Sequence, residues 1–310
     1  MPSDARPDGA RDSTDQPFIS VVVPTRNRPL ALTRCLDALA AQTLADRLEV
    51  IVVDDGSLAE EEVASIIARH RRARLIRRGS GGPAAARNAG ALDAGGAFLC
   101  FTDDDCEPQR DWVEHLVKRL QQGADAAAGT TLSRGGLLAA ASEITAHAPA
   151  ATQPPEGSDL AFATSNNLAC TKAAFEATPF DESYPDAAGE DREWCARLTA
   201  AGYVLHAEPK ARVIHRQELT FGRFLRQQAR YGRGAFRFRR IGERRPLESA
   251  GFYKALLRRA FADSFSIGLL VCVAQAATAA GFVHAWALER GDRPGLTSSI
   301  RARSSRRDGS

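Results

Sequence analysis

Residues 98–105 read Phe-Leu-Cys-Phe-Thr-Asp-Asp-Asp, so an apolar run of strand length is followed at once by three acidic residues. A short apolar run that ends at polar residues is typical of a buried strand. Neighbouring carboxylates repel one another in a folded site unless a cation neutralises them. Because alternate side chains of an extended segment point the same way, Asp103 and Asp105 can face one ion. Oxygen ligands favour hard cations, so the stretch predicts a Mg²⁺ or Mn²⁺ site, with a solvated acidic turn as the alternative.

Strand and helix patterns alternate on the N-terminal side of this stretch. Apolar and β-branched runs at 19–23, 50–53 and 75–76 predict three further buried strands, with helical patterns between and after them. This order predicts an α/β fold with a mainly parallel central sheet flanked by helices. Ligands of such sheets bind at the carboxyl ends of the strands, where the pair Asp54-Asp55 also lies.

Two turns in this region bear on nucleotide binding and on where helices begin. The first strand runs into Val-Pro-Thr-Arg-Asn-Arg at residues 23–28, which lacks the glycines of a dinucleotide-binding fingerprint. The chain also lacks a GxxxxGK[ST] loop, so acids, polar loop groups and a metal would have to hold a nucleotide. Ser57 and Glu60 have the spacing of a capping box, which predicts that Ser57 caps the next helix.

The composition is that of an ordinary globular protein, with 44% apolar and 25% charged residues among 310. A chain of this length can bury enough apolar surface to fold without disulfides. Its six cysteines form no CxxC pair and have no regular spacing. We therefore expect reduced core cysteines in a cytosolic protein.

Basic residues concentrate between Arg216 and Ala260, where thirteen Arg or Lys and three Glu give a local net charge of +10. Such a segment favours an anionic partner such as phospholipid, nucleic acid or a phosphorylated substrate. Six arginines recur every three or four residues, which predicts that most of them lie around one side of a helix: Arg223, Arg226, Arg230, Arg233, Arg237 and Arg240. With the aromatic residues between them, they also allow a non-catalytic protein that binds nucleic acid or membrane.

Residues 267–288 contain no Asp, Glu, Lys or Arg over 22 positions, which is long enough for a helix that crosses a bilayer. The stretch is rich in alanine and contains Gln275, Thr278 and His284. A buried helix, a helix at a membrane surface and a membrane span therefore remain three alternatives for this segment.

Five segments of the chain together resemble family 2 glycosyltransferases of the GT-A fold, in order and in spacing, across residues 18–240. They are Val21-Val-Val-Pro-Thr-Arg-Asn-Arg28, Val52-Val-Asp-Asp-Gly-Ser57, Gly82-Pro-Ala-Ala-Ala-Arg-Asn-Ala-Gly90, Phe101-Thr-Asp-Asp-Asp105 and Gly189-Glu-Asp191. The resemblance implies a Rossmann-like, mainly parallel central sheet flanked by helices, and the helical pattern after residue 219 adds a helical C-terminal extension. It also implies transfer of a sugar from a nucleotide-diphospho-sugar to an acceptor hydroxyl.

The resemblance further implies roles for individual residues. The nucleotide-sugar would contact Pro24, Thr25, Arg28, Asp55, Arg87, Asp103 and Asp104. A Mg²⁺ or Mn²⁺ ion would bind Asp103, Asp105 and His215. Asp191 would be the catalytic base, with its neighbour Glu190 as the alternative. The acceptor would contact Asn166, Asn167 and Trp194, for which loop capping and core packing are the structural alternatives.

The chemistry of these groups fits sugar transfer. A hydroxyl is a poor nucleophile at neutral pH, so a carboxylate has to take its proton as it attacks the anomeric carbon. Charge develops on the leaving diphosphate, where a metal ion and cationic side chains stabilise it. One base on the face opposite the leaving group gives inversion, which the resemblance also favours. A sugar-nucleotidyltransferase is an alternative enzyme, but the glycine- and lysine-rich loop that it needs is missing from the first strand end.

The sequence pattern and the resemblance together suggest how the chain is divided and where it acts. We expect a nucleotide-sugar-binding half at 18–130, an acceptor-binding and catalytic half of the same domain at 131–215, and a basic and apolar helical extension at 216–290. Polar tails at 1–17 and 291–310 are expected to be disordered. The acceptor would be a cell-surface glycan, a glycolipid or a small molecule of secondary metabolism. The protein would be cytoplasmic, with peripheral contact to an anionic membrane at its inner face, and nucleic acid is not expected as a partner.

Overall fold

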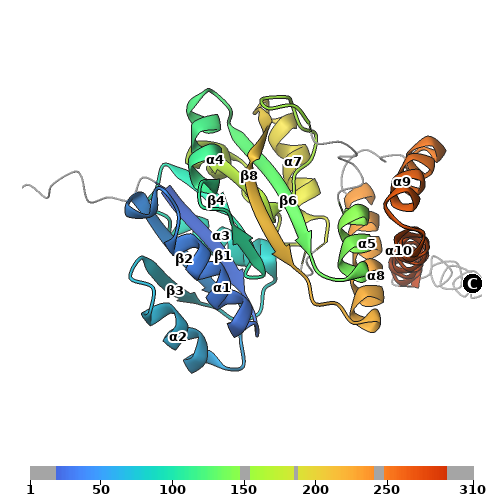
Figure 1. Cartoon of the computed structure of the whole chain (residues 1–310), viewed down its shortest axis with the longest axis horizontal. Coiled ribbons are helices and arrows are strands. Elements are labelled where there is room, and N and C mark those ends of the chain that lie inside the picture. The colour runs from blue at the N-terminus through green and yellow to red at the C-terminus, as the bar shows by residue number, and fades with distance from the viewer. Residues whose placement is uncertain (1–18, 147–153, 185–187, 241–247, 292–310) are drawn as a thin grey trace, which may run out of the picture. The chain divides into compact units, whose positions relative to one another are not determined.

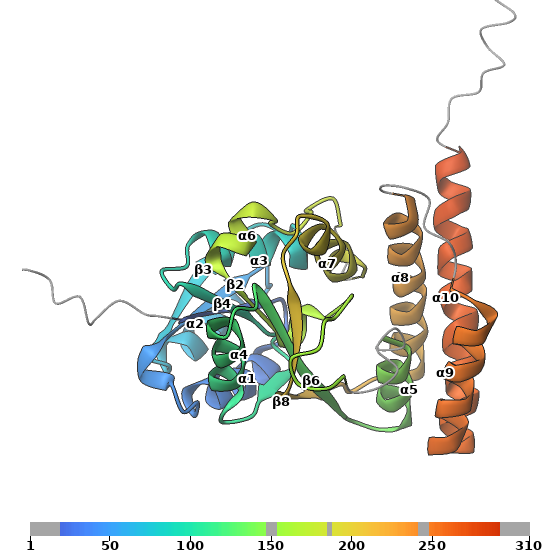
Figure 2. The ribbon, with the colours of Figure 1, turned by 90° about the horizontal axis from the view of Figure 1, so that it is seen from above.

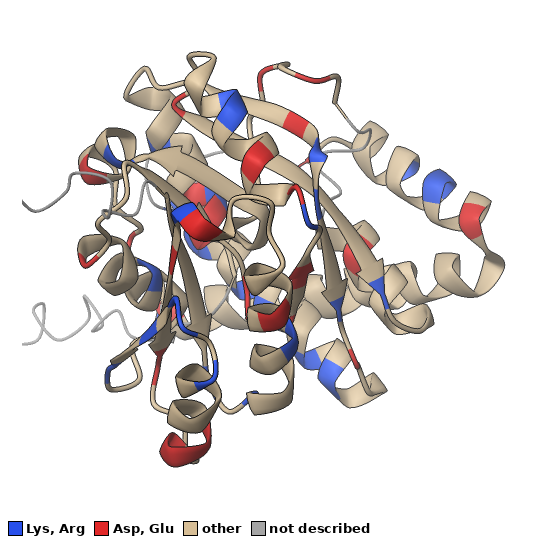
Figure 3. Cartoon of the chain, turned by 60° about the vertical axis from the view of Figure 1, so that its left-hand side comes forward, with Lys and Arg blue, Asp and Glu red and all other residues tan. Residues whose placement is uncertain are grey.

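A computed structural model describes residues 19–146, 154–184, 188–240 and 248–291, and these form two compact units. The first unit contains the described residues up to 135, then 154–184 and 190–218. The second contains 136–146, 188–189, 219–240 and 248–291. Acidic and basic positions are interspersed along the elements of the chain (Figure 3). The expected tails lie outside the described residues, except for Gly291 at the end of the last helix.

The first unit is built on an eight-stranded sheet with the order β3-β2-β1-β4-β7-β6-β8-β5 (Figure 1). Its strands are β1 (Ile19–Thr25), β2 (Leu48–Asp54), β3 (Ala73–Arg77), β4 (Phe98–Phe101), β5 (Cys106–Pro108), β6 (Ala126–Arg134), β7 (Leu168–Thr171) and β8 (Leu205–Arg216). Strands β3, β2, β1 and β4 pair in parallel, and so do β6 and β8. Strands β7 and β5 are antiparallel to their neighbours. The parallel strands β1, β2 and β4 thus direct their carboxyl ends to one edge, as the sequence predicts.

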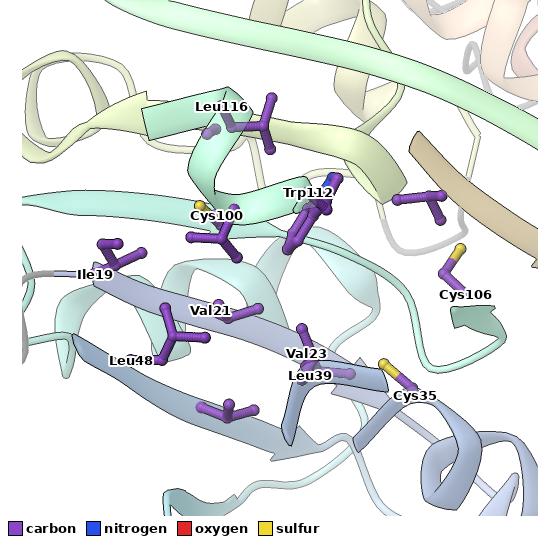
Figure 4. Packing of buried hydrophobic residues seen from close by; sticks show 14 of the residues in the cluster. Ile19, Val21, Val23, Cys35, Leu39, Leu48, Cys100, Cys106, Trp112 and Leu116 are labelled. Atoms are coloured by element: carbon purple, nitrogen blue, oxygen red, sulfur yellow. The ribbon is translucent and has the colours of Figure 1, made fainter. Parts of the chain in front are cut away.

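Helices cover both faces of this sheet. In the first unit they are α1 (Pro29–Ala40), α2 (Glu60–Ala68), α3 (Pro83–Leu92), α4 (Trp112–Gln121), α6 (Lys172–Ala177) and α7 (Glu190–Ala200), with 3-10 turns η1 (Ala45–Arg47) and η2 (Ser165–Asn167). Because side chains alternate along a strand, Val21 and Val23 of β1 pack into one core cluster and Val22 into another. Figure 4 shows the first cluster, where Val21 and Val23 lie among side chains from α1 and α4. The predicted fold, a mainly parallel sheet flanked by helices, is confirmed.

One glycine lets α3 approach the sheet closely. A Cβ atom at Gly90 would lie 2.5 Å from Cγ1 of Val22 and 3.0 Å from Cγ2 of Val53. Any larger residue would therefore push α3 away from β1 and β2. This contact fixes the position of Arg87, which lies one turn earlier on the same helix.

The start of α2 differs from its prediction. The helix begins at Glu60 with Ala59 at its N-cap, and no side chain caps it. The hydroxyl of Ser57 instead accepts a hydrogen bond from the backbone N–H of Asn27 at 2.8 Å. The N–H of Ser57 donates to the Asp54 carboxylate at 2.9 Å. The capping-box prediction is wrong because Ser57 joins the turns that follow β1 and β2.

The second unit consists of α5 (Leu137–Ala146), α8 (Phe221–Arg240), α9 (Ala250–Asp263) and α10 (Phe265–Gly291). Helix α10 runs beside α8 and also packs against α9 (Figure 2). Helix α10 is long and apolar enough to cross a membrane, judged by length and composition alone. Only 22% of its most apolar 18-residue stretch is buried inside the protein, so the helix does not fit the alternative of a buried core helix.

The six cysteines are free thiols in the structure. Five of the six are buried, and Cys272 on α10 is the exception. Burial raises the pKa of the thiols of Cys100 and Cys195 to about 12, so these two are inert core residues at neutral pH.

Candidate active site

The three acids after β4 lie at the carboxyl edge of the sheet, next to the end of β1. Asp104 is buried and accepts hydrogen bonds from the Thr25 hydroxyl at 2.8 Å and from Arg28 Nη1 at 3.0 Å. Burial and the neighbouring carboxylates raise the pKa of Asp104 to about 7, although Arg28 and Thr25 oppose the shift. The Asp104 carboxylate in turn raises the pKa of Arg28, which keeps this guanidinium charged. The sequence-predicted residues Thr25, Arg28 and Asp104 are therefore in direct contact.

Asp105 lies between two cationic or potentially cationic groups. Its Oδ2 is 2.8 Å from Arg28 Nη1, and its Oδ1 is 3.3 Å from Nε2 of His215. Burial alone would raise the pKa of Asp105, but the hydrogen bond and charge of His215, together with Arg28, outweigh burial and lower it. Asp105 is therefore an anion at neutral pH.

Strand pairing brings His215 to this position. In the antiparallel ladder of β5 and β8, Cys106 lies directly opposite His215. Ligand atoms of Asp105, Cys106 and His215 all lie within 4.8 Å of one another, a spacing that could hold a metal ion. The predicted ligands Asp105 and His215 are thus brought together across 110 positions of sequence. Sequence reasoning missed Cys106, because only the register of β5 against β8 places its sulfur there.

Arg87 connects the acids of β4 to the start of α7. Its guanidinium is buried, with Nη2 2.7 Å from Asp103 Oδ1 and Nη1 3.2 Å from Glu190 Oε1. Its Cζ also lies 5.7 Å from the centre of the Phe180 ring, which adds a cation–π contact. The buried Arg87 guanidinium therefore fixes the position of Asp103 relative to Glu190.

Glu190 is a buried carboxylate next to Asp191. Burial, followed by the Asp191 charge, raises the pKa of Glu190 to about 8, although the charge and hydrogen bond of Arg87 oppose the shift. Native Glu190 therefore keeps a proton that the unfolded chain releases between about pH 4.5 and 8. The native state binds more protons than the unfolded state in this window, so the free energy of unfolding falls as pH rises.

We expect Glu190→Gln to flatten this pH dependence. Glutamine has the size of a protonated glutamate but cannot release a proton, so the contribution of this residue to the fall between pH 5 and 8 disappears. Urea unfolding of both proteins across that range measures the difference. Equal falls in the wild type and the variant would show that Glu190 is already ionised in the native state.

Asp191 lies on the first turn of α7 and is less buried than its neighbour. Its Oδ2 accepts from the backbone N–H of Ser165 at 3.1 Å and from the Ser165 hydroxyl at 3.3 Å. These two bonds orient the carboxylate and involve only one of its oxygens. Sequence reasoning missed Ser165, although its place directly before Asn166 in the predicted acceptor loop was an available signal.

Asp55 and the glycine turn form a second part of the site. The two oxygens of the buried Asp55 carboxylate accept from the backbone N–H groups of Gly81 and Gly82 at 2.8 and 2.9 Å. Gly82 has φ +87°, a conformation that favours glycine. Asp55 therefore shapes the turn that leads into α3. Pro24, the other residue predicted at this edge, is half-buried in β1 next to Thr25.

Two of the three residues predicted to bind the acceptor have their polar groups occupied inside the protein. Asn167 is buried, and its amide accepts from Trp112 Nε1 at 2.8 Å and donates to the Ala211 carbonyl at 3.1 Å. Trp194 is fully buried, donates to the Thr178 carbonyl at 2.6 Å and stacks on Phe180. The structure gives Asn167 and Trp194 structural roles, because neither side chain reaches the surface.

Asn166, the third residue predicted to bind the acceptor, is buried and held by three threonine hydroxyls. Its Oδ1 accepts from the hydroxyls of Thr164 at 2.7 Å and Thr131 at 3.3 Å, and its carbonyl accepts from Thr102. The Thr102 bond ties the loop of Ser165 and Asn166 to the end of β4, and the Thr131 bond ties it to β6. The loop that orients Asp191 is therefore anchored beside the acid triplet.

Together these groups form a site with three chemical parts. Asp105 and His215 can hold a cation, and Arg28 and Arg87 supply fixed positive charge. Asp191 is an oriented carboxylate next to Glu190, which Arg87 contacts. Such an arrangement can stabilise a developing negative charge and accept a proton in the same reaction.

Comparison with known proteins gives consistent matches. The model of glycosyl transferase family 2 matches residues 20–174, and that of glycosyl transferase family group 2 matches residues 140–288. The glycosyltransferase AglE of Haloferax volcanii is 32% identical over 228 residues, which are 70% of this chain and 73% of that protein. The pre-mycofactocin glycosyltransferase of Mycobacterium tuberculosis is 30% identical over 227 residues, 70% of this chain, and the match spans less than half, 46%, of that relative's length.

Solved structures share the fold. The mannosyltransferase PcManGT of Pyrobaculum calidifontis, in complex with GDP-Man and Mn²⁺, has a TM-score of 0.57 at 19% identity, over 96% of this chain and 82% of that one. Residues 1–349 of S. aureus TarS have a TM-score of 0.52 at 18% identity, over 88% of this chain and 92% of that one.

Proposed function

The chain belongs to glycosyl transferase family 2 and transfers a sugar from a nucleotide-sugar, and we propose that it does so with a divalent metal and with inversion at the anomeric carbon. The acceptor would be a hydroxyl of a cell-surface glycan, a glycolipid or a small molecule. The observation that carries this proposal is the connection of Asp103, Arg87, Glu190 and the oriented Asp191 carboxylate in one site.

Asp191 is the base in this proposal. Ser165 donates both of its hydrogen bonds to Oδ2, which leaves Oδ1 to take the proton of the acceptor hydroxyl. Glu190 is less suited to that role, because it is almost fully buried and its Oε1 is bonded to Arg87. A single base that acts opposite the leaving diphosphate produces inversion, whereas retention would need a second displacement.

The donor would lie along the carboxyl edge of the sheet. We assign the diphosphate to the side of Arg28 and Arg87, whose charges are fixed by the surrounding acids. Pro24 and Thr25 would border the base, and Asp103 would contact the ribose. Asp55 and Asp104 would shape this pocket mainly through the glycine turn and Thr25, since their oxygens already accept hydrogen bonds there.

The residues around Asp105 fit a divalent cation. The donor set combines carboxylate oxygen with imidazole nitrogen, and these atoms lie close enough to share one ion. Asp105 and His215 would hold Mn²⁺ or Mg²⁺, with Asp103 at the side of the donor. When bound, the ion would neutralise charge on the leaving diphosphate.

Cleavage of nucleotide-sugars by the purified protein tests this proposal. Water can replace the acceptor, so we expect slow release of UDP or GDP from one member of a panel of UDP- and GDP-sugars, dependent on Mn²⁺ or Mg²⁺. The alternative of a non-catalytic protein that binds through the Arg-rich segment predicts no release from any member. Equal release with EDTA would contradict the metal part of the proposal.

A further inference from the structure

Helix α10 presents an apolar stripe to the outside of the second unit. Exposed apolar and small residues follow one another mostly at intervals of three or four: Phe265, Leu269, Cys272, Val273, Ala276, Ala280, Val283 and Ala287, with Ala279, Trp286 and Leu288 also exposed. Phe265 is 71% exposed, Leu269 50% and Val283 57%. Ser266 and His284 are the polar positions along the exposed side before the helix reaches Arg290. A helix that is apolar on its exposed side as well as on its packed side needs a partner that is itself apolar.

The other side of α10 is packed tightly against α8. A Cβ atom at Gly232 of α8 would lie 1.9 Å from the carbonyl oxygen of Thr278, and one at Gly281 of α10 would lie 1.9 Å from that of Ala229. The two backbones therefore touch at these glycines, and only glycine permits the approach. Near the other end of α8, Arg240 pairs with Glu289 of α10 at 2.6 Å. Helix α8 thus accompanies α10 along much of its length.

The charges of α8 exclude an orientation in which α8 and α10 cross a membrane together. The buried positions of α8 include Phe224, Gln228, Gly232 and Phe238. Four of the six recurring arginines are exposed and two are half-buried: Arg223, Arg226, Arg237 and Arg240, then Arg230 and Arg233. From Arg223 to Arg240 these arginines extend about 25 Å, close to the thickness of a hydrocarbon core. If α10 crossed a bilayer, these arginines would lie at the same depth, which is very unfavourable.

Helix α9 extends the apolar surface and borders it with basic residues. Phe261 of α9 is exposed, and its ring centre lies 5.8 Å from that of Phe265. Lys254 and Arg258 are exposed on the same helix. At the C-terminal end of α10, the exposed Trp286 packs against the guanidinium of Arg290 at 4.1 Å. Aromatic residues and long cationic side chains beside an apolar stripe are typical of helices that lie at a membrane surface.

We propose that the exposed side of α9 and α10 binds an anionic lipid bilayer, with α10 lying in the plane of the membrane surface. The apolar stripe would enter the boundary between head groups and acyl chains, while Lys254 and Arg258 meet anionic head groups. This inference does not depend on the proposed reaction, because membrane binding is measured without donor or acceptor.

Co-sedimentation with vesicles tests the surface. We expect the full chain to bind phosphatidylcholine vesicles that contain phosphatidylglycerol, and to bind them less at high salt. The double variant Leu269→Glu, Val283→Glu should partition about tenfold less or lower, since it places two charges in the stripe. Leu92→Glu is the matched control, because Leu92 is 79% exposed on α3 of the first unit and should leave binding unchanged. Binding by the double variant equal to that of the wild type would overturn the proposal.

A second copy of the chain is the competing partner for the stripe. If the wild type ignores vesicles but forms a concentration-dependent dimer that the double variant loses, the stripe is a protein interface and the proposal fails.

Cys272 allows the orientation of α10 to be measured. It is the exposed cysteine of the chain, so an environment-sensitive fluorophore can be attached there and at Ala287→Cys in a Cys272→Ser background. The two positions are 15 residues apart, or about 22 Å along the helix. Quenching by nitroxide lipids of different depths should place both fluorophores equally shallow. Clearly different depths at the two positions would show a crossing helix and contradict the in-plane orientation.

Discussion

Asp105→Ala is expected to abolish Mn²⁺-dependent binding of the donor nucleotide while the protein stays folded. Asp105 contacts His215 through one oxygen and Arg28 through the other, so its removal takes the carboxylate out of the proposed metal site. Loss of groups that merely support a ligand lowers metal affinity about 10–100-fold, so loss of a direct ligand should cost about 100-fold or more. Arg28 keeps its bond to Asp104 in this variant, which limits the structural damage.

Calorimetric titration of UDP and GDP, with Mn²⁺ and with EDTA, measures this effect. Glu107→Ala is the matched control, because Glu107 lies two residues further on in β5 and pairs with Arg216 outside the proposed site. The control should keep Mn²⁺-dependent binding. If Asp105→Ala binds nucleotide and Mn²⁺ as tightly as the control does, the metal has been assigned to the wrong residues.

Asp191→Asn is expected to lower the rate of transfer by about 10²–10⁴-fold while donor binding changes little. Asparagine keeps the size of the side chain and an oxygen that can accept from Ser165, so the loop and α7 should stay in place. Only the proton acceptor is lost. Comparison of the turnover number with the donor dissociation constant separates the two effects.

Glu190→Gln provides the contrast for this measurement. In the proposal Glu190 only holds Arg87 in place, and the oxygen of glutamine can accept the same hydrogen bond from Arg87. If Asp191 is the base, Glu190→Gln should therefore retain much more turnover than Asp191→Asn. The opposite order of the two variants would assign the base to Glu190.

The sequence predicts well those parts of the site that depend on one strand end. The three acids after β4 and the carboxyl end of β1 could be placed because an apolar run followed by polar residues has few structural solutions. The contact between Asp105 and His215 depends instead on the register of β5 against β8, which no local pattern specifies. For this residue the family resemblance supplied what periodicity could not.

Single aromatic and amide residues were the least predictable. Trp194 lies one turn after Glu190, and this spacing is equally compatible with a sugar platform and with a core residue. The structure decides for the core, because the indole stacks on Phe180 and bonds to a carbonyl. Ser57 shows the same limit for hydroxyls, since a partner 30 positions away competes with the local cap.

The anomeric form of the released sugar tests the central claim most directly. The wild-type protein is incubated with Mn²⁺ and an α-linked nucleotide-sugar that it cleaves, and the first product is observed by proton NMR before the anomers equilibrate. Attack by one water molecule activated by Asp191 predicts β-sugar as the first product, with formation slowed strongly in Asp191→Asn. First formation of α-sugar, or the same rate of β-sugar formation in Asp191→Asn, would contradict the proposed inverting mechanism.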